Sequence, residues 1–447
     1  MKRTLQSGKP YAGNPHVRFD EGEVASAATP RRGSLLYKKL LMIVGAAAVA
    51  VGAYADTYTD ANNIAWTYFT NSDGENTVTL GYDSGNTPCI STSASVDAAD
   101  IPWTFEKDGI AYTVTQIGSC AFWQCSGLTG TLAIPPSVTK YLGIGYTFHS
   151  TGIEGISSFG TGVTSVGGNN SFYGCSALSG TIVIDDGFAA SFGNYAFAAC
   201  TAMTGIIVGK GTQQTGRYFA SGDSSLAGAW FKGRPTVSLG TQDYTAVGTT
   251  YTFQNCTALK VVLLGKNTAA YESGTFLNGV TGCKVFAPAN GKWDSLNLGG
   301  TDNVKIPYGA GQNLDLAIDE NAGTITATPT TEERLVQVLE AAPVFKAQFG
   351  LNTRINVTNT IEATAGTITA AMLNAVEFNT MLMTFAVKTQ AQLDSVLAAV
   401  PQTAMLAIDP TGARQELTLP SDRAIWVWLA GDGKYTPKIK GLMISFR

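Results

Sequence analysis

Seven cysteines and one histidine after residue 55 are the first candidates for nucleophilic or transition-metal chemistry. A serine or cysteine nucleophile needs a base beside it, and His149 is the single histidine beyond residue 55. The same scarcity excludes a histidine-rich metal site. The sequence has no phosphate-cradling glycine loop and no nucleophile elbow. We therefore expect His149 to be an exposed turn residue, and we assign no catalytic residue, metal or cofactor.

Four of the cysteines recur at one position of a repeated motif, Ala-Phe-x-x-Cys-x-x-Leu, which a short apolar stretch follows. Such a repeat predicts parallel ladders of buried side chains, in which cysteine acts as a small apolar residue. Neighbouring rungs of a stacked sheet lie about 5 Å apart, so disulfide bonds remain the alternative to free, buried thiols. The ladder positions are Phe122, Cys125, Leu128, Phe172, Cys175, Leu178, Phe197, Cys200, Met203, Phe253, Cys256 and Leu259.

The period of the motif predicts about seven short coils between residues 115 and 308. One interval between aromatic anchors is about ten residues longer than the others, which predicts an insertion around residues 218–228. A unit of this size cannot bury its own apolar face, but stacked neighbours can. The expected anchors are Phe122, Phe148, Phe172, Phe197, Phe231, Phe253 and Phe276.

The core motif Ile-Gly-x-x-Ala-Phe-x-x-Cys-x-x-Leu at residues 117–128 closely resembles the BspA-like leucine-rich repeats of secreted bacterial proteins. The resemblance covers about residues 100–290 and includes a lead-in hairpin at 103–114. It implies a β-rich, curved or twisted solenoid of leucine-rich repeats. It also implies surface attachment or protein binding, and it brings no catalytic residues with it.

The segments before the repeats indicate export. Residues 38–55 have a basic start, an apolar run and a small-residue cleavage site at Ala53 and Ala55, as in a secretory signal. The apolar run is shorter than the roughly 20 residues that span a bilayer, so we expect cleavage before Asp56, with an uncleaved membrane anchor as the alternative. Residues 1–37 fit this signal poorly and are interpreted as a leader or a mis-called start. Residues 56–114 are β-patterned and are expected to cap the first repeat.

Residues 309–447 differ in composition and are expected to form a separate α+β domain. Two helices are predicted at 331–343 and 389–401, where Thr, Leu, Val, Leu, Ala and Pro recur at matching positions. Threonine supplies the N-cap oxygen of each helix, and proline marks its end. The match suggests two related β-helix-β halves.

Charge excludes one class of partner. Residues 56–447 hold 21 Lys and Arg against 30 Asp and Glu, which leaves no basic patch for nucleic acid. Two acidic groups, Asp185-Asp186 and Asp315 with Asp319 and Glu320, could ligate calcium. Neither has a calcium-loop motif, so solvated turns are the favoured interpretation.

The outward positions of the repeat strands are unexpectedly apolar. A solvated strand face usually carries polar residues, yet Ala133, Val183, Ile207 and Leu263 stand there. A partner-binding stripe is one interpretation, because exposed apolar patches mark contact sites. The alternative, slightly favoured, is that the inserted loop or the C-terminal domain covers this face.

These observations favour an exported, non-catalytic bacterial protein, secreted or held at the cell surface, that binds a protein or another cell-surface ligand. Contact with a membrane is expected only through the signal segment, if it is uncleaved. One alternative is an enzyme with its active site in residues 309–447 and the solenoid as a targeting module. A second alternative is a structural component of the cell envelope.

Overall fold

The computed structural model describes residues 55–437, with gaps at 74, 82–86, 142–144, 167, 235–243, 358–360, 365–366, 381–382, 401–405, 410–416, 421–424 and 430–433. The expected leader and the signal segment up to Tyr54, including Ala53, lie outside the described residues. Ala55 is exposed and directly precedes the first strand. Within the described part of the chain, no helix is both long and apolar enough to cross a membrane.

The first sheet joins the segment before the repeats to the repeats themselves. Its hairpin turns at Asp108 and Gly109, whose φ values of 54° and 75° suit a primed turn, as the sequence predicts. Trp66 and Leu80 are fully buried in the same core as Phe122, so this segment continues the core of the repeats. The strand order is β1 (Asp56–Thr59), β2 (Ala65–Thr70), β3 (Thr77–Leu80), β6 (Ile110–Ile117), β9 (Lys140–Tyr141) and β11 (Ser165–Val166), with β5 (Thr104–Lys107) paired to β6.

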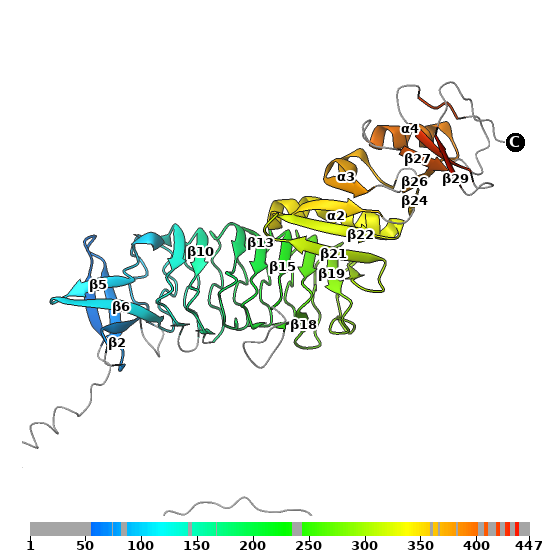
Figure 1. Cartoon of the computed structure of the whole chain (residues 1–447). Coiled ribbons are helices and arrows are strands. Elements are labelled where there is room, and N and C mark those ends of the chain that lie inside the picture. Colours follow the sequence, from blue (N-terminus) through cyan, green and yellow to red (C-terminus); the bar gives the residue numbers. More distant parts are fainter. Residues whose placement is uncertain are drawn as a thin grey trace, which may run out of the picture. The chain divides into compact units, whose positions relative to one another are not determined.

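Figure 1 shows the repeats as rows of short strands that succeed one another along the chain. The strands of each row pair in parallel, one repeat apart, so every repeat buries a face of the next. The longest row is β12 (Gly180–Val183), β13 (Met203–Val208), β15 (Gly228–Phe231), β17 (Val261–Leu264), β19 (Lys284–Pro288) and β20 (Val304–Tyr308). The other parallel rows are β8 (Thr131–Ile134) with β10 (Gly155–Phe159), β4 (Val96–Asp97) with β7 (Leu128–Thr129), and β14 (Gln214–Thr215) with β16 (Thr245–Val247) and β18 (Thr268–Ala270).

Stacked phenylalanines and cysteines fill the interior of the repeats. The rings of Phe122, Phe148, Phe172 and Phe197 lie nearly parallel, with successive centroids 4.9, 5.1 and 5.2 Å apart. The thiols of Cys175 and Cys200 donate to backbone carbonyls of the preceding repeat at 3.0 and 3.1 Å. All seven cysteines are free and buried, as befits small apolar residues in a core. The leucine-position residues Leu128, Leu178, Met203 and Leu259 are fully buried as well.

The fifth repeat differs from the sequence prediction. Phe172 N donates to the carbonyl of Ala196, the residue before the next anchor, and Phe197 N likewise donates to Phe219. This register places Ala220 at the phenylalanine position, with Asp223 and Leu226 at the cysteine and leucine positions. The expected anchor Phe231 is therefore wrong, because Phe231 pairs with Val208 and Leu264 within the strand row.

The same hydrogen-bond register places the insertion and the last anchor at positions that differ from those expected from the sequence. Thr245 begins β16 only after the long connection that follows Phe231, so the extra residues lie between β15 and β16 and not at 218–228. Phe253 N donates to the carbonyl of Phe276, which places Leu277 at the anchor position. The anchor expected at Phe276 is thus displaced by one residue.

Asp223 is a carboxylic acid in the cysteine ladder. Its side chain is fully buried, and its Oδ1 accepts a hydrogen bond of 2.6 Å from the backbone N–H of Cys200. Its Oδ2 is buried without a hydrogen-bond partner. Burial raises the pKa of Asp223 well above its ordinary value, because the charged form loses its hydration. The acid is therefore held in its neutral form more readily than an exposed aspartate.

The residues after the repeats form two sheets, each with a parallel β-helix-β unit of the kind that the sequence suggests. In the first, α2 (Glu332–Phe349) connects two strands, and in the second, α4 (Gln390–Ala399) does so. One sheet has the order β21 (Leu314–Asp319), β22 (Thr324–Pro329), β23 (Asn352–Asn356) and β25 (Val376–Thr380). The other has the order β24 (Ile361–Thr364), β26 (Met383–Ala386), β27 (Leu406–Asp409), β28 (Ile425–Leu429) and β29 (Lys434–Pro437), and α3 (Ala370–Asn374) precedes β25.

Helix α2 begins as predicted but ends later. The hydroxyl of Thr331 caps it by accepting from Arg334 N, and Thr389 caps α4 in the same way. The predicted end at Pro343 is wrong, because Pro343 lies inside α2, which continues to Phe349 and ends at left-handed Gly350. An interior proline costs a helix about 3 kcal/mol. The last turns are held by Phe345 and Phe349, both buried against the repeats.

Helix α2 covers the outward face of the later repeat strands. The ring of Phe345 lies 5.4 Å from that of Phe286, and the ring of Phe349 lies 5.8 Å from that of Trp230. Gly228 permits this approach, since a Cβ there would stand 3.0 Å from Val344. The Gln348 side-chain oxygen also accepts hydrogen bonds of 2.9 and 3.1 Å from the hydroxyls of Thr181 and Thr204. The repeats and α2 therefore share one apolar core.

A pair of substitutions in one strand row tests this cover. Ile207→Ala is expected to lower the free energy of unfolding by about 2–5 kcal/mol, because Ile207 is 7% exposed beneath α2. Val183→Ala, its neighbour in the row, should change it by no more than about 0.5 kcal/mol, because Val183 is 44% exposed. Urea unfolding of both variants measures the difference. Equal losses for the two would contradict the cover.

The buried acid makes stability depend on pH. A folded-state pKa above the unfolded value means that wild-type stability falls as pH rises from about 4 through the folded pKa. Asp223→Asn keeps an oxygen for the Cys200 N–H but does not ionise. We expect it to match wild type near pH 3 and to be more stable at pH 7 by about 1–3 kcal/mol.

Urea unfolding at the two pH values measures this effect. Asp108→Asn, at an exposed hairpin position, is the matched control and should show no such pH-dependent gain. An Asp223→Asn variant that gains nothing at pH 7 would contradict the account of the buried acid.

Candidate functional site

The four outward residues expected to form a binding stripe fall into two groups. Ala133 and Val183 are exposed on β8 and β12. Ile207 and Leu263 are 7% and 0% exposed, because they lie in the core that the repeats share with α2. At Ile207 and Leu263 the alternative interpretation holds, because residues of the C-terminal part cover this face. The uncovered face runs over β8, β10 and β12.

The row on which α2 packs continues beyond the residues that the sequence singled out. Strand pairing aligns Val183 with Ile207, then with Trp230, Leu263, Phe286 and Ile306. All of these except Val183 belong to the core around α2. Val183 thus stands at the open edge of an apolar row that the chain itself otherwise covers.

Burial makes four of the cysteines unsuited to nucleophilic chemistry, whereas at Cys175 hydrogen bonds with Cys200 and Thr151 outweigh the effect of burial and lower the pKa. Burial raises the pKa of Cys125 to about 12 and that of Cys283 to about 12, so both stay protonated at neutral pH. Cys200 and Cys89 are fully buried with their pKa values raised by the same cause. A protonated thiol is a poor nucleophile and a poor metal ligand, because the thiolate is the reactive form.

His149 is half-buried, not exposed as expected. Its ring stacks on Tyr173 at 5.0 Å and tilts against Tyr146 at 5.4 Å. Burial lowers its pKa below the usual value, so the neutral imidazole is favoured. Its aromatic neighbours make His149 a member of a stack of rings, an arrangement that the spacing of the repeats could have indicated.

One residue from each of the two acidic groups considered for calcium forms ion pairs with lysines. Asp186 and Glu320 both pair with Lys210 and Lys232, and the Glu320 carboxylate oxygens lie 2.8 Å from each ammonium nitrogen. Asp185 accepts a hydrogen bond of 2.9 Å from the backbone N–H of Phe159. Among the described residues, no group of three potential ligands could hold a metal ion. The sequence could not predict this network, because its members come from separate elements.

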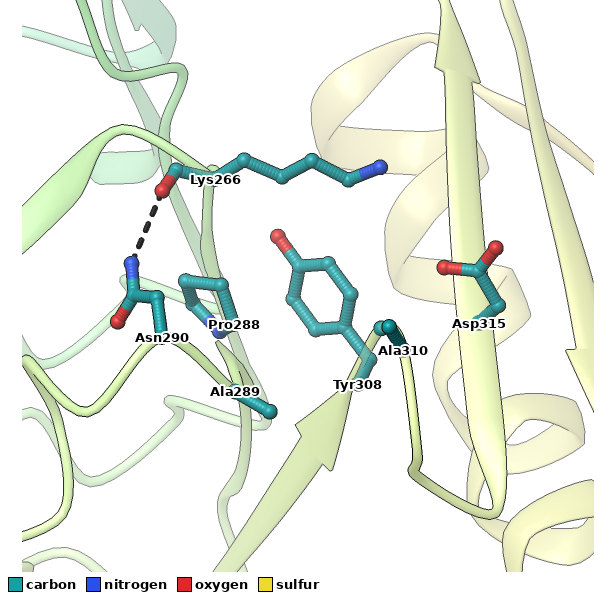
Figure 2. A pocket seen from close by; sticks show the side chains of 8 residues that line it. Lys266, Pro288, Ala289, Asn290, Tyr308, Ala310 and Asp315 are labelled. Atoms are coloured by element: carbon teal, nitrogen blue, oxygen red, sulfur yellow. Dashed lines mark hydrogen bonds between the residues drawn. The ribbon is translucent and has the colours of Figure 1, made fainter.

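A hollow of about 460 Å³ lies between the residues that follow β17 and β19 and the connection from β20 to β21 (Figure 2). Figure 2 shows the ring of Tyr308 between the side chains of Lys266 and Asp315, with Pro288 and Ala289 beside it. The Tyr308 hydroxyl donates a 2.6 Å hydrogen bond to the carbonyl of Leu264, and burial raises its pKa. This hydroxyl is therefore engaged in the fold.

Comparison with known proteins identifies the repeats. Residues 104–227 match the model of the BspA type leucine rich repeat region, in 6 copies. No curated protein matches the chain.

Several solved bacterial structures are similar to this chain at low identity. One is a leucine-rich repeat protein of T. pallidum, with 16% identity, 55% of this chain and 84% of that chain covered, and a TM-score of 0.26. Another is a leucine-rich cell surface protein from Faecalibacterium prausnitzii, with 15% identity, coverage of 76% and 97%, and a TM-score of 0.29. A third, a leucine-rich repeat protein from Bacteroides ovatus, has 15% identity, coverage of 59% and 92%, and a TM-score of 0.17.

The assignment rests on residues 104–227, which include the buried ladder residues from Phe122 to Met203. Residues 104–227 of this chain belong to the BspA type of leucine-rich repeat.

Proposed function

We propose that this chain is an exported bacterial protein that binds another protein at the cell surface through its repeats and has no catalytic activity. In this proposal residues 115–308 form a solenoid of seven coils, residues 56–114 cap its first coil, and residues 309–447 form a separate domain. Residues 38–55 direct export and are removed before Asp56.

One observation carries the proposal. The cysteines are buried, His149 packs against two tyrosine rings, and Asp186 and Glu320 are held in ion pairs, while the face over β8, β10 and β12 stays open. Leucine-rich repeats of this type supply a broad, stacked surface, and stacked repeats commonly use such surfaces for binding. Val183, 44% exposed at the edge of an apolar row, is the kind of residue that gains free energy when a partner covers it.

Site-specific crosslinking tests the binding surface. A photoreactive benzophenone side chain at position 183 of the full chain, illuminated on intact cells, is expected to give a covalent adduct with one protein. The same group at position 394, which is exposed on α4, is the matched control and should give none. Adducts of equal yield from both positions, or none from position 183, would count against the proposed surface.

Export has its own test. Protein recovered from the bacterial surface by mild washing is expected to begin at Asp56, which mass spectrometry of the intact chain reads directly. External trypsin on intact cells should degrade it. A chain that retains residues 38–55 supports the anchored alternative, and a chain protected from external trypsin refutes surface exposure.

A further inference from the structure

Strand β21 stands at the edge of its sheet, with hollows along its unpaired side. It pairs with β22 alone. The hollow of about 460 Å³ and a second one of about 320 Å³ both have residues of β21 in their lining, and they share Lys266 and Tyr308. We call the two hollows together the β21 groove. Its far side is formed by residues at or just after the ends of β15, β17, β19 and β20.

The groove follows the edge of β21 and not one face of the sheet. Side chains along a strand alternate between the two faces. Three consecutive residues of β21, Leu316, Ala317 and Ile318, nevertheless all line the smaller hollow. An opening that meets both faces of one strand lies at its edge, so the groove gives access to the backbone of β21.

The backbone of β21 directs hydrogen-bonding groups into this groove. In an antiparallel pair, alternate residues direct their N–H and C=O groups towards the partner strand. Leu314 lies opposite Pro329, which has no N–H, and its carbonyl accepts a 2.9 Å hydrogen bond from Gly309 N. Leu314 therefore faces away from β22, and by the same alternation Leu316 and Ile318 do so as well.

Three of these outward backbone groups are unpaired. The N–H of Leu316 donates to the side chain of Asp315 at 2.9 Å. The C=O of Leu316 and both the N–H and the C=O of Ile318 have no hydrogen-bond partner in the described part of the chain. Unpaired groups on an edge strand are a template for another strand. A peptide main chain is therefore the ligand whose donors and acceptors match this edge.

The shape of the groove suits one extended segment. Trp230, Tyr308 and Leu316 are each at most 3% exposed and give the groove apolar walls. A strand that pairs with β21 would lie about 4.8 Å from it and would direct every second side chain towards these walls. In a second copy of this chain, β21 is recessed against its own repeats in the same way. Two whole copies therefore cannot bring these edges together, whereas a single segment can enter.

The charges that line the groove balance one another. Its lining contains two lysines and two carboxylates. Lys232 is paired with Glu320 at 2.8 Å, and Figure 2 shows Lys266 and Asp315 on either side of the ring of Tyr308. Since no net charge is left to attract an acidic or a basic side chain, a segment with uncharged side chains fits the groove best.

We propose that the β21 groove binds a short, uncharged segment of another protein, which adds to β21 as an extended strand. Its apolar side chains, at alternate positions, pack against Trp230, Tyr308 and Leu316. Addition of a peptide to an open sheet edge is a general mode of recognition, in which main-chain hydrogen bonds supply affinity. The groove is separate from the open face at Val183, so this inference goes beyond the proposed function.

The test measures binding of three fluorescein-labelled heptapeptides to the full chain by fluorescence anisotropy. Each peptide alternates threonine with valine, leucine or phenylalanine, and at least one of them is expected to bind saturably. The same peptide with methylated backbone nitrogens keeps every side chain but loses its N–H donors. This matched control should bind at least tenfold more weakly.

A proline substitution tests the pairing with the edge itself. Ile318→Pro removes the unpaired N–H but no bond to β22, and proline is tolerated where a strand's N–H faces outward. The peptide is expected to bind this variant at least fivefold more weakly, because one of its carbonyls loses its donor. Ile318→Val keeps the N–H and should bind within twofold of wild type.

A second substitution covers the case in which the proline variant does not fold. Ala289→Trp places a large side chain at an exposed position in the lining of the larger hollow, and a loss of at least tenfold is expected. Ala322→Trp, exposed on the turn after β21 and outside the groove, is its control and should bind within twofold of wild type.

Three results would overturn the proposal. They are no saturable binding of any of the three peptides, equal binding of the methylated peptide, and an affinity that either groove substitution leaves unchanged. A wild-type dimer in light scattering that Ile318→Pro converts to a monomer would overturn it in favour of a second copy. Because crosslinking at position 183 does not involve the β21 groove, failure here leaves the proposed function to be judged separately.

Discussion

The stacking of each repeat on the next is the interaction on which the rest of this molecule depends. One repeat offers a phenylalanine, a cysteine and a leucine to the interior, too little to exclude water alone. The neighbouring repeat completes the burial of these side chains. The parallel phenylalanine rings, about 5 Å apart, are in contact from one repeat to the next. Since the same stacking fixes the spacing of the turns and of the outward strand positions, it also fixes the spacing of every surface that could meet a partner.

The outward face of the strands is covered in one part of the chain and open in another. Where it is most apolar, from Ile207 to Ile306, helix α2 packs on it and the two share a core. Where it carries small or polar residues, as at Ala133, it remains open. Val183 stands at the boundary between the two. The apolar outward residues therefore hold the chain's own C-terminal part in place, and external partners are left with the open strands and the turns.

The repeat motif made much of this arrangement predictable, and its failures have physical causes. Regular copies such as Phe172, Cys175 and Leu178 share one spacing, so their burial follows from the pattern alone. In the fifth repeat the phenylalanine stands at position 219, one residue before the anchor position. A period based on phenylalanine therefore points to Phe231, which lies in the strand. The positions of Ala220, Asp223 and Leu226 keep the spacing of the regular copies, and this spacing identifies the fifth repeat. Asp223 was hidden for the same reason, because its position is recognisable only in register with Cys200 and Cys256.

Other features lie beyond sequence patterns because they depend on contacts between distant segments. Pro343 would end an isolated helix, but Phe345 and Phe349 bind the following turns to the repeats. The pairing of Glu320 with Lys210 and Lys232 joins residues that are remote in the chain. The stacked rings of Tyr195, Tyr218 and Tyr251, by contrast, follow from the register of the repeats, because each stands two residues before an anchor position.

Native-state hydrogen exchange measures whether α2 and the repeat strands open together as one cooperative core. If they share one core, backbone amides of α2 and of β15 and β17 are exposed only by the same opening event, with equal free energies and equal dependence on denaturant. If the amides of α2 exchange through a separate opening of much lower free energy, the strand face is not a built-in interface and the account is contradicted.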